Sequence, residues 1–444
     1  MKAAMAGVPA LARQLVDSLF GCRGGELLVG GVPVGELARA HGTPLYAYDQ
    51  RVLEARYREL REALAGFAEV YYSIKANPHP AVAGRFVALG AGLEIASAGE
   101  FRLAKAAGCE PGRMLFAGPG KGFEELREAI AGGIGEVHLE SFEEIEACGA
   151  LTAQLGCSLA VALRLNPGAA AQGGAMRMGG KPAAFGFDEE ILDDAVAAVQ
   201  RHAGLRLEGI HLFVGTQVLQ AEVLLQQWAC GLELAGRLAQ RLGRPLRRID
   251  LGGGLGIPYH AGQGTLDLAS VRDGAAALAR RQRADPWLAP SEVLVEPGRW
   301  LAGPAGVYVA RVRSVKMSRG QRFVVCDGGM HHHLAASGNL GQVIKLDYPL
   351  VAATRLDDTE LAPAQLVGPL CTPLDTLGRQ TPLPAALRAG DLVAVLQSGA
   401  YGLTASPVGF LGHALPAEVM VCEGVHQRLP LAGVFAGPDD GRRG

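Results

Sequence analysis

Residues 69–80 read EVYYSIKANPHP, a short apolar run that ends on Lys75. Valine, tyrosine and isoleucine dominate the run, and these residue types favour a buried, extended strand. The segment therefore predicts a β-strand over 69–75, with a lysine at its carboxyl end.

Seven further segments after this run are also short and apolar. They are separated by stretches whose apolar residues have helical spacing, such as FRLAKAAG and FEELREAIAGG. Strands that alternate with helices predict a parallel sheet. Eight such units in about 230 residues fit a closed (β/α)₈ TIM barrel, with an open doubly wound sheet as the alternative. The seven predicted strands are 92–96, 114–117, 136–139, 160–165, 208–213, 248–251 and 292–296.

The texture changes after residue 300, where valine-rich segments alternate apolar and polar residues, as in GVYVARVRSVKM and RFVVCDGG. This pattern is typical of an all-β domain. We therefore expect an α/β fold of three parts: an N-terminal segment 1–44 that joins the β-domain through ELLVGGVPVGELA, a barrel over 45–300, and a C-terminal β-domain over 301–444. The Gly- and Ala-rich stretch 166–187 is interpreted as a mobile active-site segment.

The composition suits a globular enzyme of two or three domains. The 444 residues are 49% hydrophobic and 19% charged. The formal net charge is −2, so no strong positive potential is expected to attract nucleic acid or an anionic membrane. The N-terminus places Arg13, Gln14 and Asp17 inside its apolar pattern, which indicates a short amphipathic helix rather than a signal peptide. Eight cysteines without a CxxC pair favour reduced thiols in the cytoplasm.

Lys75 is the first candidate for chemistry, because reactive groups of a (β/α)₈ barrel lie where strands end and loops begin. A lysine there can simply extend its amine to solvent. Alternatively, desolvation lowers the pKa of the amine and makes it a nucleophile for a Schiff base.

Two more strand ends carry useful groups. In DLGGGLGIPY at 250–259, three successive glycines expose backbone N–H groups that can cradle a phosphate, whereas the GxGxxG spacing of a dinucleotide site is absent. In VEPGRW at 295–300, Glu296 can hold a pyridine nitrogen protonated and Arg299 can bind a phosphate or a carboxylate. A structural ion pair between Glu296 and Arg299 is the plain alternative.

Together these pieces resemble fold-type III pyridoxal-5′-phosphate (PLP) decarboxylases, the ornithine, diaminopimelate and arginine decarboxylase family with an alanine-racemase-like barrel. The likeness runs over roughly residues 26–425, with its motifs in family order. The motifs are YYSIKANPHP, GAGLEIASAGE, HLFVGTQ, DLGGGLGIPY, EPGR, GPLCTPLD and GDLVAVLQSGAY.

The resemblance implies a PLP-dependent carboxy-lyase that decarboxylates an L- or D-amino acid, or a modified or carrier-tethered aminoacyl substrate, through a Schiff base on Lys75. It places Glu94, Ser97 and Glu100 near the cofactor and pairs Glu296 with the pyridine nitrogen. The residues that it implies for the phosphate are Thr216, Gly252, Gly253, Gly254 and Tyr401, with help from Arg299.

The resemblance further implies a homodimer with shared active sites. Cys371 and Asp375 would come from the other subunit, Cys371 as the proton donor to the carbon that has lost CO₂. Asp375 and Arg299 would contact the substrate. A racemase would need a tyrosine base opposite Lys75, and a non-catalytic regulator of the same fold would need none of these residues.

The chain also departs from the family pattern. Phe213 stands where the family stacks a histidine on the PLP ring; it can stack but cannot titrate. Thr372 and Pro373 replace the Glu-Ser of diaminopimelate decarboxylases, and Ala335 and Ala336 replace their Arg-Pro. The chain then lacks the carboxylate that would bind a distal ammonium and the guanidinium that would bind a distal carboxylate. The small residues 335–337 leave room for a substrate with a neutral or tethered distal end. The chain thus looks most like pathway decarboxylases of natural products or exopolysaccharides.

His331, His332 and His333 raise the question of a metal site. Three successive residues of a strand alternate between opposite faces, so their rings cannot converge on one ion. We therefore expect no metal there and interpret these residues as a loop near the mouth of the active site.

Overall fold

The structure is a computed structural model that describes residues 5, 7–168, 176–177, 182–213, 215–339 and 346–431. The chain forms two compact units, each of which is described by itself below. The β-unit contains Met1–Ala55, Pro258–Gln263 and Leu301–Gly444, and the barrel unit contains Arg56–Ile257 and Gly264–Trp300.

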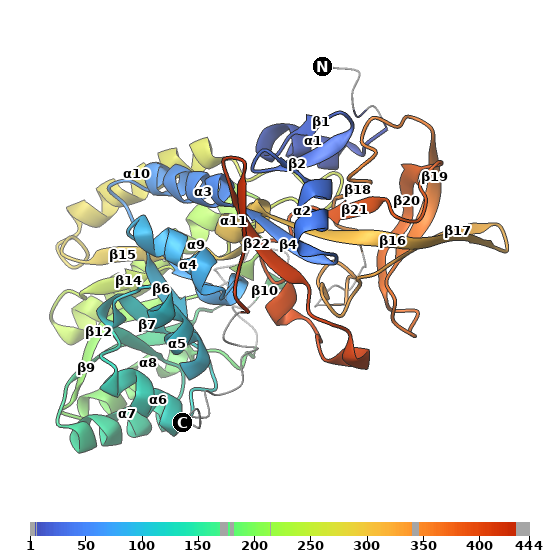
Figure 1. Cartoon of the computed structure of the whole chain (residues 1–444). Helices are drawn as coiled ribbons and strands as arrows, with labels where there is room; N and C mark the ends of the chain where they lie inside the picture. Colours follow the sequence, from blue (N-terminus) through green and yellow to red (C-terminus); the bar gives the residue numbers. More distant parts are fainter. Residues whose placement is uncertain are drawn as a thin grey trace, which may run out of the picture. The chain divides into compact units, whose positions relative to one another are not determined.

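The barrel unit is a closed ring of parallel strands, as the sequence predicts (Figure 1). Each strand pairs with the next along the chain, and the last pairs with the first through Leu294↔Glu69. The ring consists of β5 (Glu69–Ser73), β6 (Gly92–Ile95), β7 (Met114–Phe116), β8 (Glu136–Leu139), β9 (Leu159–Asn166), β12 (Leu205–Leu212), β14 (Arg248–Asp250) and β15 (Glu292–Val295). The short β11 (Phe187–Asp188) adds to the edge of β9.

Helices follow the strands because their sequences carry an apolar stripe and defined starts. Ser97 and Ser141 accept hydrogen bonds from the third residues of the helices after them, Glu100 and Glu144, and Asp267 caps α10 in the same way. The helices are α3 (Gln50–Ala63), α4 (Pro80–Ala88), α5 (Ala98–Ala106), α6 (Phe123–Ala131), α7 (Phe142–Leu155), α8 (Leu192–Gln200), α9 (Ala221–Leu242) and α10 (Leu268–Ala284).

The β-unit is built around the long strand β16 (Gly306–Ser318), which pairs with β17 (Gln321–Cys326), β21 (Leu392–Val395) and β4 (Leu45–Asp49). The described strands follow the order β20-β19-β17-β16-β4-β22-β23, with β18 on β21. The remaining strands are β18 (Leu350–Val351), β19 (Leu361–Val367), β20 (Thr376–Pro384), β22 (Ala417–Cys422) and β23 (Val425–Arg428).

The boundary expected at residue 45 differs from the structure. β4 follows that position, yet it lies between β16 and β22 in the β-sheet, and the β-unit continues to Ala55. The strand LYAYD is buried at every position, so its local pattern alone does not tell which sheet it joins.

The N-terminal segment packs in the β-unit, although it forms its own small sheet. The helix α1 (Ala10–Leu19) is amphipathic as expected and buries Ala12, Leu15 and Val16. The motif ELLVGGVPVGELA forms β2 (Glu26–Val29), β3 (Val32–Pro33) and α2 (Val34–His41), with β1 (Cys22–Arg23) alongside. Leu27, Val29 and Leu37 join Val307 and Val419 in one hydrophobic cluster.

Half of the stretch 166–187, interpreted as a mobile segment, lies outside the described residues, so that interpretation stays a prediction. Across the described parts of the chain, no helix combines the length and the apolar character that crossing a membrane requires.

Candidate active site

Lys75 lies directly after β5, in the single turn Ile74–Ala76, at the carboxyl end of the barrel strands. Its Nζ is 3.0 Å from Oε2 and 3.1 Å from Oε1 of Glu94, at the same level on β6. Ser73 donates a second hydrogen bond of 2.5 Å to Glu94. The Glu94 side chain is 2% exposed, whereas the Lys75 side chain is 45% exposed. A buried carboxylate thus holds the Nζ atom of Lys75, while the Lys75 side chain as a whole remains partly exposed.

Glu100 adds a second carboxyl group beside this pair. Its Oε2 accepts the backbone N–H of Ala96, which holds the side chain over the start of α5. Burial and the negative charge of Glu94 raise the pKa of Glu100 to about 7, against the opposing effects of the Ala96 N–H and Lys75. Glu100 therefore titrates near neutral pH.

The glycine loop after β14 approaches other backbone too closely for any side chain. A Cβ on Gly252 would lie 2.2 Å from the carbonyl oxygen of Leu212, and the residue has φ +68°. A Cβ on Gly253 would lie 2.6 Å from the carbonyl oxygen of Glu296, and one on Gly254 would lie 2.8 Å from that of Gly215. The three residues must be glycine, and their peptide groups are therefore free of covering side chains.

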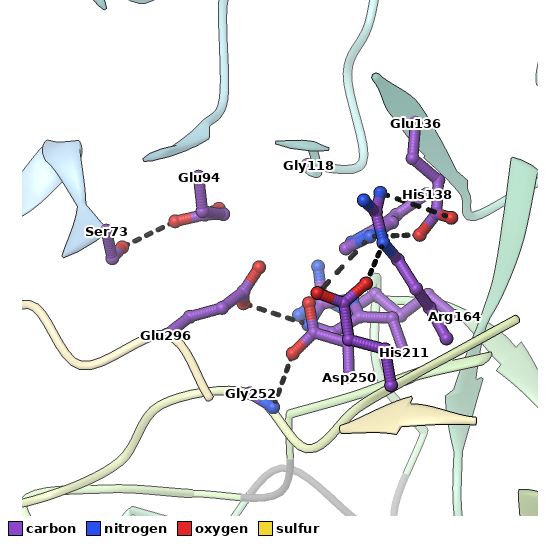
Figure 2. Close-up of polar contacts among 12 residues, drawn as sticks. Ser73, Glu94, Gly118, Glu136, His138, Arg164, His211, Asp250, Gly252 and Glu296 are labelled. Atoms are coloured by element: carbon purple, nitrogen blue, oxygen red, sulfur yellow. Dashed lines mark hydrogen bonds and ion pairs between the residues drawn. The ribbon is translucent and has the colours of Figure 1, made fainter. Parts of the chain in front are cut away.

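Glu296 follows β15 and is buried among polar groups (Figure 2). Its Oε2 is 3.3 Å from Nε2 of His211, whose ring lies on the neighbouring β12. Burial, followed by the positive field of His138 and Arg164, lowers the pKa of His211 well below its ordinary value, so this ring is neutral. The contact is a close approach of a neutral ring to the carboxyl group, since neither ring nitrogen of His211 has a hydrogen-bond partner among the described residues.

Below Glu296 the space between the strands holds further polar groups. Nε2 of His138 is 3.3 Å from Glu136 and 3.8 Å from Asp250, and its ring centroid is 4.4 Å from that of His211. Asp250 also accepts the N–H of Gly252 at 2.8 Å. TIM barrels are usually filled here with branched aliphatic residues, so this polar column is unusual.

A third group of polar contacts borders the site on the side of β8 and β9. Arg164 donates to Glu140 at 2.7 Å, and Glu140 also accepts the N–H groups of Gly118 and Gly186. The Arg164 guanidinium lies 6.0 Å from the ring centroid of Phe213. The glutamate thus joins three loops that follow different strands.

The remaining sequence-predicted residues of the barrel unit also lie at strand ends. Phe213 directly follows β12, and its Cε2 would be 3.8 Å from a Cβ on Gly253. Thr216 is half-buried in β13 (Gly215–Thr216), which pairs with β10 (Met176–Arg177). Arg299 begins α11 (Arg299–Ala302) directly after the Glu296 segment. The structure thus places Phe213 beside the glycine loop, with Glu296 against that loop.

Three predicted site residues, Cys371, Asp375 and Tyr401, belong to the β-unit. Cys371 is exposed on the loop before β20. Asp375 is buried, and its two oxygens accept the backbone N–H groups of Met330, at 2.6 Å, and Leu370, at 2.9 Å. Asp375 therefore secures the loop that carries Cys371.

The triple-histidine segment lies outside the helices and strands, as a loop should, and all three residues are buried. Nε2 of His332 bonds the carbonyl oxygen of Ala414, and Nε2 of His333 bonds Oγ of Ser398. Burial lowers the pKa of His333 to about 3. Within the described residues, the one cluster with the spacing of metal ligands lies instead at His138, His211, Asp250 and Glu296.

The small residues 335–337 do not provide the space expected of them. Ala335 is 5% exposed, and Ala336 and Ser337 are fully buried in the β-unit. The N–H of Ala336 faces Nδ1 of His333, so these residues pack against the histidine segment. Their small size serves close packing within the unit.

Sequence reasoning did not single out His138, Arg164, His211 or Asp250. A weak signal was present, since each lies within a strand and alternates with apolar residues, as in EVHLE and ALRLN. A polar residue at every second position indicates that one strand face is polar. Burial on both faces of barrel strands obscures which face that is.

Comparison with known proteins shows what this arrangement is similar to. The sequence profile "Pyridoxal-dependent decarboxylase, pyridoxal binding domain" matches residues 50–303. An L-glutamyl-[BtrI acyl-carrier protein] decarboxylase of Niallia circulans is 38% identical over 89% of this chain and 93% of its own length. A diaminopimelate decarboxylase of Zymomonas mobilis is 32% identical over 90% of this chain and 93% of its own.

A solved structure agrees with the sequence relatives. The diaminopimelate decarboxylase of Helicobacter pylori in complex with L-lysine superposes with a TM-score of 0.77 at 26% identity. The match covers 89% of this chain and 95% of that one. The similarity therefore includes both the barrel and the β-unit.

Proposed function

This chain belongs to the pyridoxal-dependent decarboxylases, and we propose that it releases CO₂ from an aminoacyl group presented by an acyl-carrier protein. The chain is a PLP-dependent carboxy-lyase with the barrel and β-domain of its family. The proposal concerns its substrate and the roles of its residues. The observation that carries it is the 38% identity to a decarboxylase of a carrier-bound glutamyl group.

The residues at the barrel's carboxyl end fit PLP on two independent grounds. The glycine loop leaves backbone N–H groups uncovered, which suits a phosphate. Oε1 of Glu296 is buried and has no hydrogen-bond partner among the described residues, which suits the N–H of a pyridinium ring. The exposed amine of Lys75 supplies the group that holds the cofactor covalently.

We assign the cofactor contacts accordingly. Lys75 would hold PLP covalently through its Nζ, which Glu94 keeps in place. Glu296 keeps the pyridine nitrogen protonated, and Phe213 stacks on the ring. The phosphate contacts are Thr216, Gly252, Gly253, Gly254 and Tyr401, with Arg299 for either the phosphate or the substrate carboxylate.

When bound, PLP supplies an electron sink for the electron pair left behind as the carboxylate departs. The α-carbon then needs one proton. We assign this proton to the thiol of Cys371 from a second subunit of a homodimer. The exposure of Cys371 agrees with this role, and Asp375, which secures the loop of Cys371, is assigned to contact the substrate.

The substrate proposal agrees with the composition of the loops. A free diamino acid needs a carboxylate for its distal ammonium, and Thr372 and Pro373 provide none. Diaminopimelate needs in addition a guanidinium for its distal carboxylate, where this chain has Ala335 and Ala336. An unpaired buried charge costs several kcal/mol. A substrate whose distal end is tethered avoids this cost.

The test is CO₂ release from a glutamyl group on an acyl carrier, compared with free glutamate, diaminopimelate, lysine and ornithine. We expect catalytic efficiency for the free amino acids at least ~100-fold below that for the carrier-bound substrate, the scale of one good charged contact. Efficient turnover of free meso-diaminopimelate, about 10⁴ M⁻¹s⁻¹ or more, would instead favour diaminopimelate decarboxylase, to which the chain is also similar.

We further propose a cytoplasmic location. All eight cysteines are free thiols, and two of them, Cys157 and Cys371, are exposed. Exposed thiols persist in reducing compartments.

A further inference from the structure

The polar column below the cofactor site contains two carboxyl groups, Asp250 and Glu296, that are removed from water. Asp250 is fully buried and Glu296 is 6% exposed. Oδ2 of Asp250 and Oε1 of Glu296 have no hydrogen-bond partner among the described residues, and the two carboxyl groups approach within 4.8 Å. Two buried negative charges at this distance repel strongly in a medium of low dielectric constant.

One shared proton relieves this repulsion. Burial, followed by the negative charge of the nearby Glu296 carboxyl group, raises the pKa of Asp250 well above its ordinary value. The charged groups around the pair do not remove the need for this proton. Two carboxylates and two guanidinium groups are among them, and their charges offset one another. The surrounding charged and titratable groups are Glu94, Glu136, His138, Arg164, His211 and Arg248.

The polar contacts decide which carboxyl group holds the proton. Oε2 of Glu296 has the polar Nε2 atom of neutral His211 3.3 Å away, a contact without hydrogen-bond geometry that still favours the ionised form of Glu296. Asp250 is bonded to the N–H of Gly252 through Oδ1 only, and its Oδ2 is left to carry a proton (Figure 2). The arrangement therefore favours a neutral Asp250 and an anionic Glu296.

We propose that Asp250 holds a proton at neutral pH and donates it in a hydrogen bond to Glu296, so that Glu296 meets the pyridine nitrogen as an anion held by Asp250 and His211. This inference rests on the cofactor contacts proposed above, not on the identity of the substrate. Asp250 is a positioning residue, since it acts on the cofactor through Glu296. It also links this carboxylate to the glycine loop through the bond to Gly252.

A metal ion is the competing explanation for this cluster, because its four ligand atoms lie within 4.8 Å of one another. Metal-ligating histidines almost always donate their other ring N–H to a partner. Nδ1 of His138 and Nδ1 of His211 have no such partner among the described residues. The geometry thus agrees better with a shared proton.

The test is infrared spectroscopy of the full-length, PLP-loaded protein with ¹³C at the aspartate carboxyl carbon. At pH 7 we expect a C=O band of a protonated aspartic acid that shifts in D₂O and is lost in Asp250→Asn. The amide oxygen of the introduced asparagine can still accept the Gly252 N–H, so this variant keeps the local bond. Glu100→Gln is the matched control, since it removes a different, largely buried carboxyl group and must leave the aspartate band unchanged.

A second variant separates charge coupling from a merely structural role. In Glu296→Gln the neighbouring negative charge is gone, so the aspartate band should titrate at a pH lower by about one unit or more. The proposal is overturned if wild type and Asp250→Asn have the same aspartate bands at pH 7, or if the midpoint is unchanged in Glu296→Gln. Stoichiometric zinc in the purified protein, lost in Asp250→Asn, would establish the metal site instead.

Discussion

The barrel unit and the β-unit contribute to chemistry in opposite ways. In the barrel, Lys75, Glu94 and Glu296 come from separate strands, yet all are tied to neighbours within that unit. In the β-unit, Cys371 and Leu374 are exposed on one loop, and Leu374 is 50% exposed. The barrel groups contact one another inside their unit, whereas the loop of Cys371 exposes a thiol and an apolar side chain to solvent.

This difference teaches that the two regions have different requirements. The barrel groups must be held against one another, because unpaired buried charges are costly. The loop of Cys371 is secured by Asp375, while Cys371 and Leu374 on that loop are exposed. Exposed apolar and reactive groups on one loop agree with a shared site in a dimer.

The largest effect is expected from Lys75→Ala. Loss of the attaching amine should reduce decarboxylation by roughly 10³-fold or more and abolish covalent retention of PLP. Borohydride reduction followed by peptide mapping should find the pyridoxyl label on Lys75 in the wild type. A label on Lys105, Lys121 or Lys181 would show that the barrel pocket is wrongly assigned.

The division between the units can be tested by mixing chains. Lys75→Ala and Cys371→Ala subunits should each be nearly inactive, while equal mixtures form hybrid dimers with one intact site. Activity should then return to about a quarter of wild type. Subunit exchange is verified with two affinity tags, and proven exchange without activity would refute a shared site.

The close approach of the glycine loop predicts a smaller effect. Gly253→Ala would place a Cβ 2.6 Å from the carbonyl oxygen of Glu296 and so displace the loop. We expect PLP affinity to fall about tenfold, or about 1.4 kcal/mol. Gly264→Ala is the matched control, since a Cβ there meets nothing within 4 Å. Equal PLP affinity of both variants would argue against a cradle at this loop.

The smallest effect concerns Glu100 and pH. Its pKa rises from 4.5 to about 7 on folding, so the folded state binds more protons in that window and stability falls as pH rises through it. Glu100→Gln lacks this loss. Its stability relative to wild type should increase by about 1–2 kcal/mol between pH ~4.5 and ~8, less than the ~3.4 kcal/mol that a pKa change from 4.5 to about 7 gives without screening, because Glu100 is partly exposed to solvent. Urea unfolding measures this, with the exposed Glu62→Gln as the control that shows no such trend.

Much of the architecture could be predicted because it depends on local patterns. The eight barrel strands occur where short apolar runs predict them, and α1 occurs where an amphipathic pattern does. β4 shows the limit of this reasoning. Its five residues are buried throughout, and only pairing with β16 and β22 decides that it belongs to the β-unit.

The histidines illustrate the same limit for side chains. Three adjacent histidines form a loop, as predicted, but the sequence did not indicate that all three are buried in the β-unit, where His332 bonds Ala414 and His333 bonds Ser398. Two histidines far apart in the chain, His138 and His211, instead lie with their ring centroids 4.4 Å apart inside the barrel. Sequence separation carries no information about such distances.

The sequence by itself determined the barrel, the lysine after its first strand, the glycine loop and the carboxylate after the last strand, because each depends on residues that are neighbours in the chain. Only the tertiary structure decided that Asp250 lies against Glu296 and that Asp375 turns both oxygens to backbone N–H groups. Charge sharing and desolvation depend on distances of a few ångströms between strands, and these distances exist only once the ring of strands has closed.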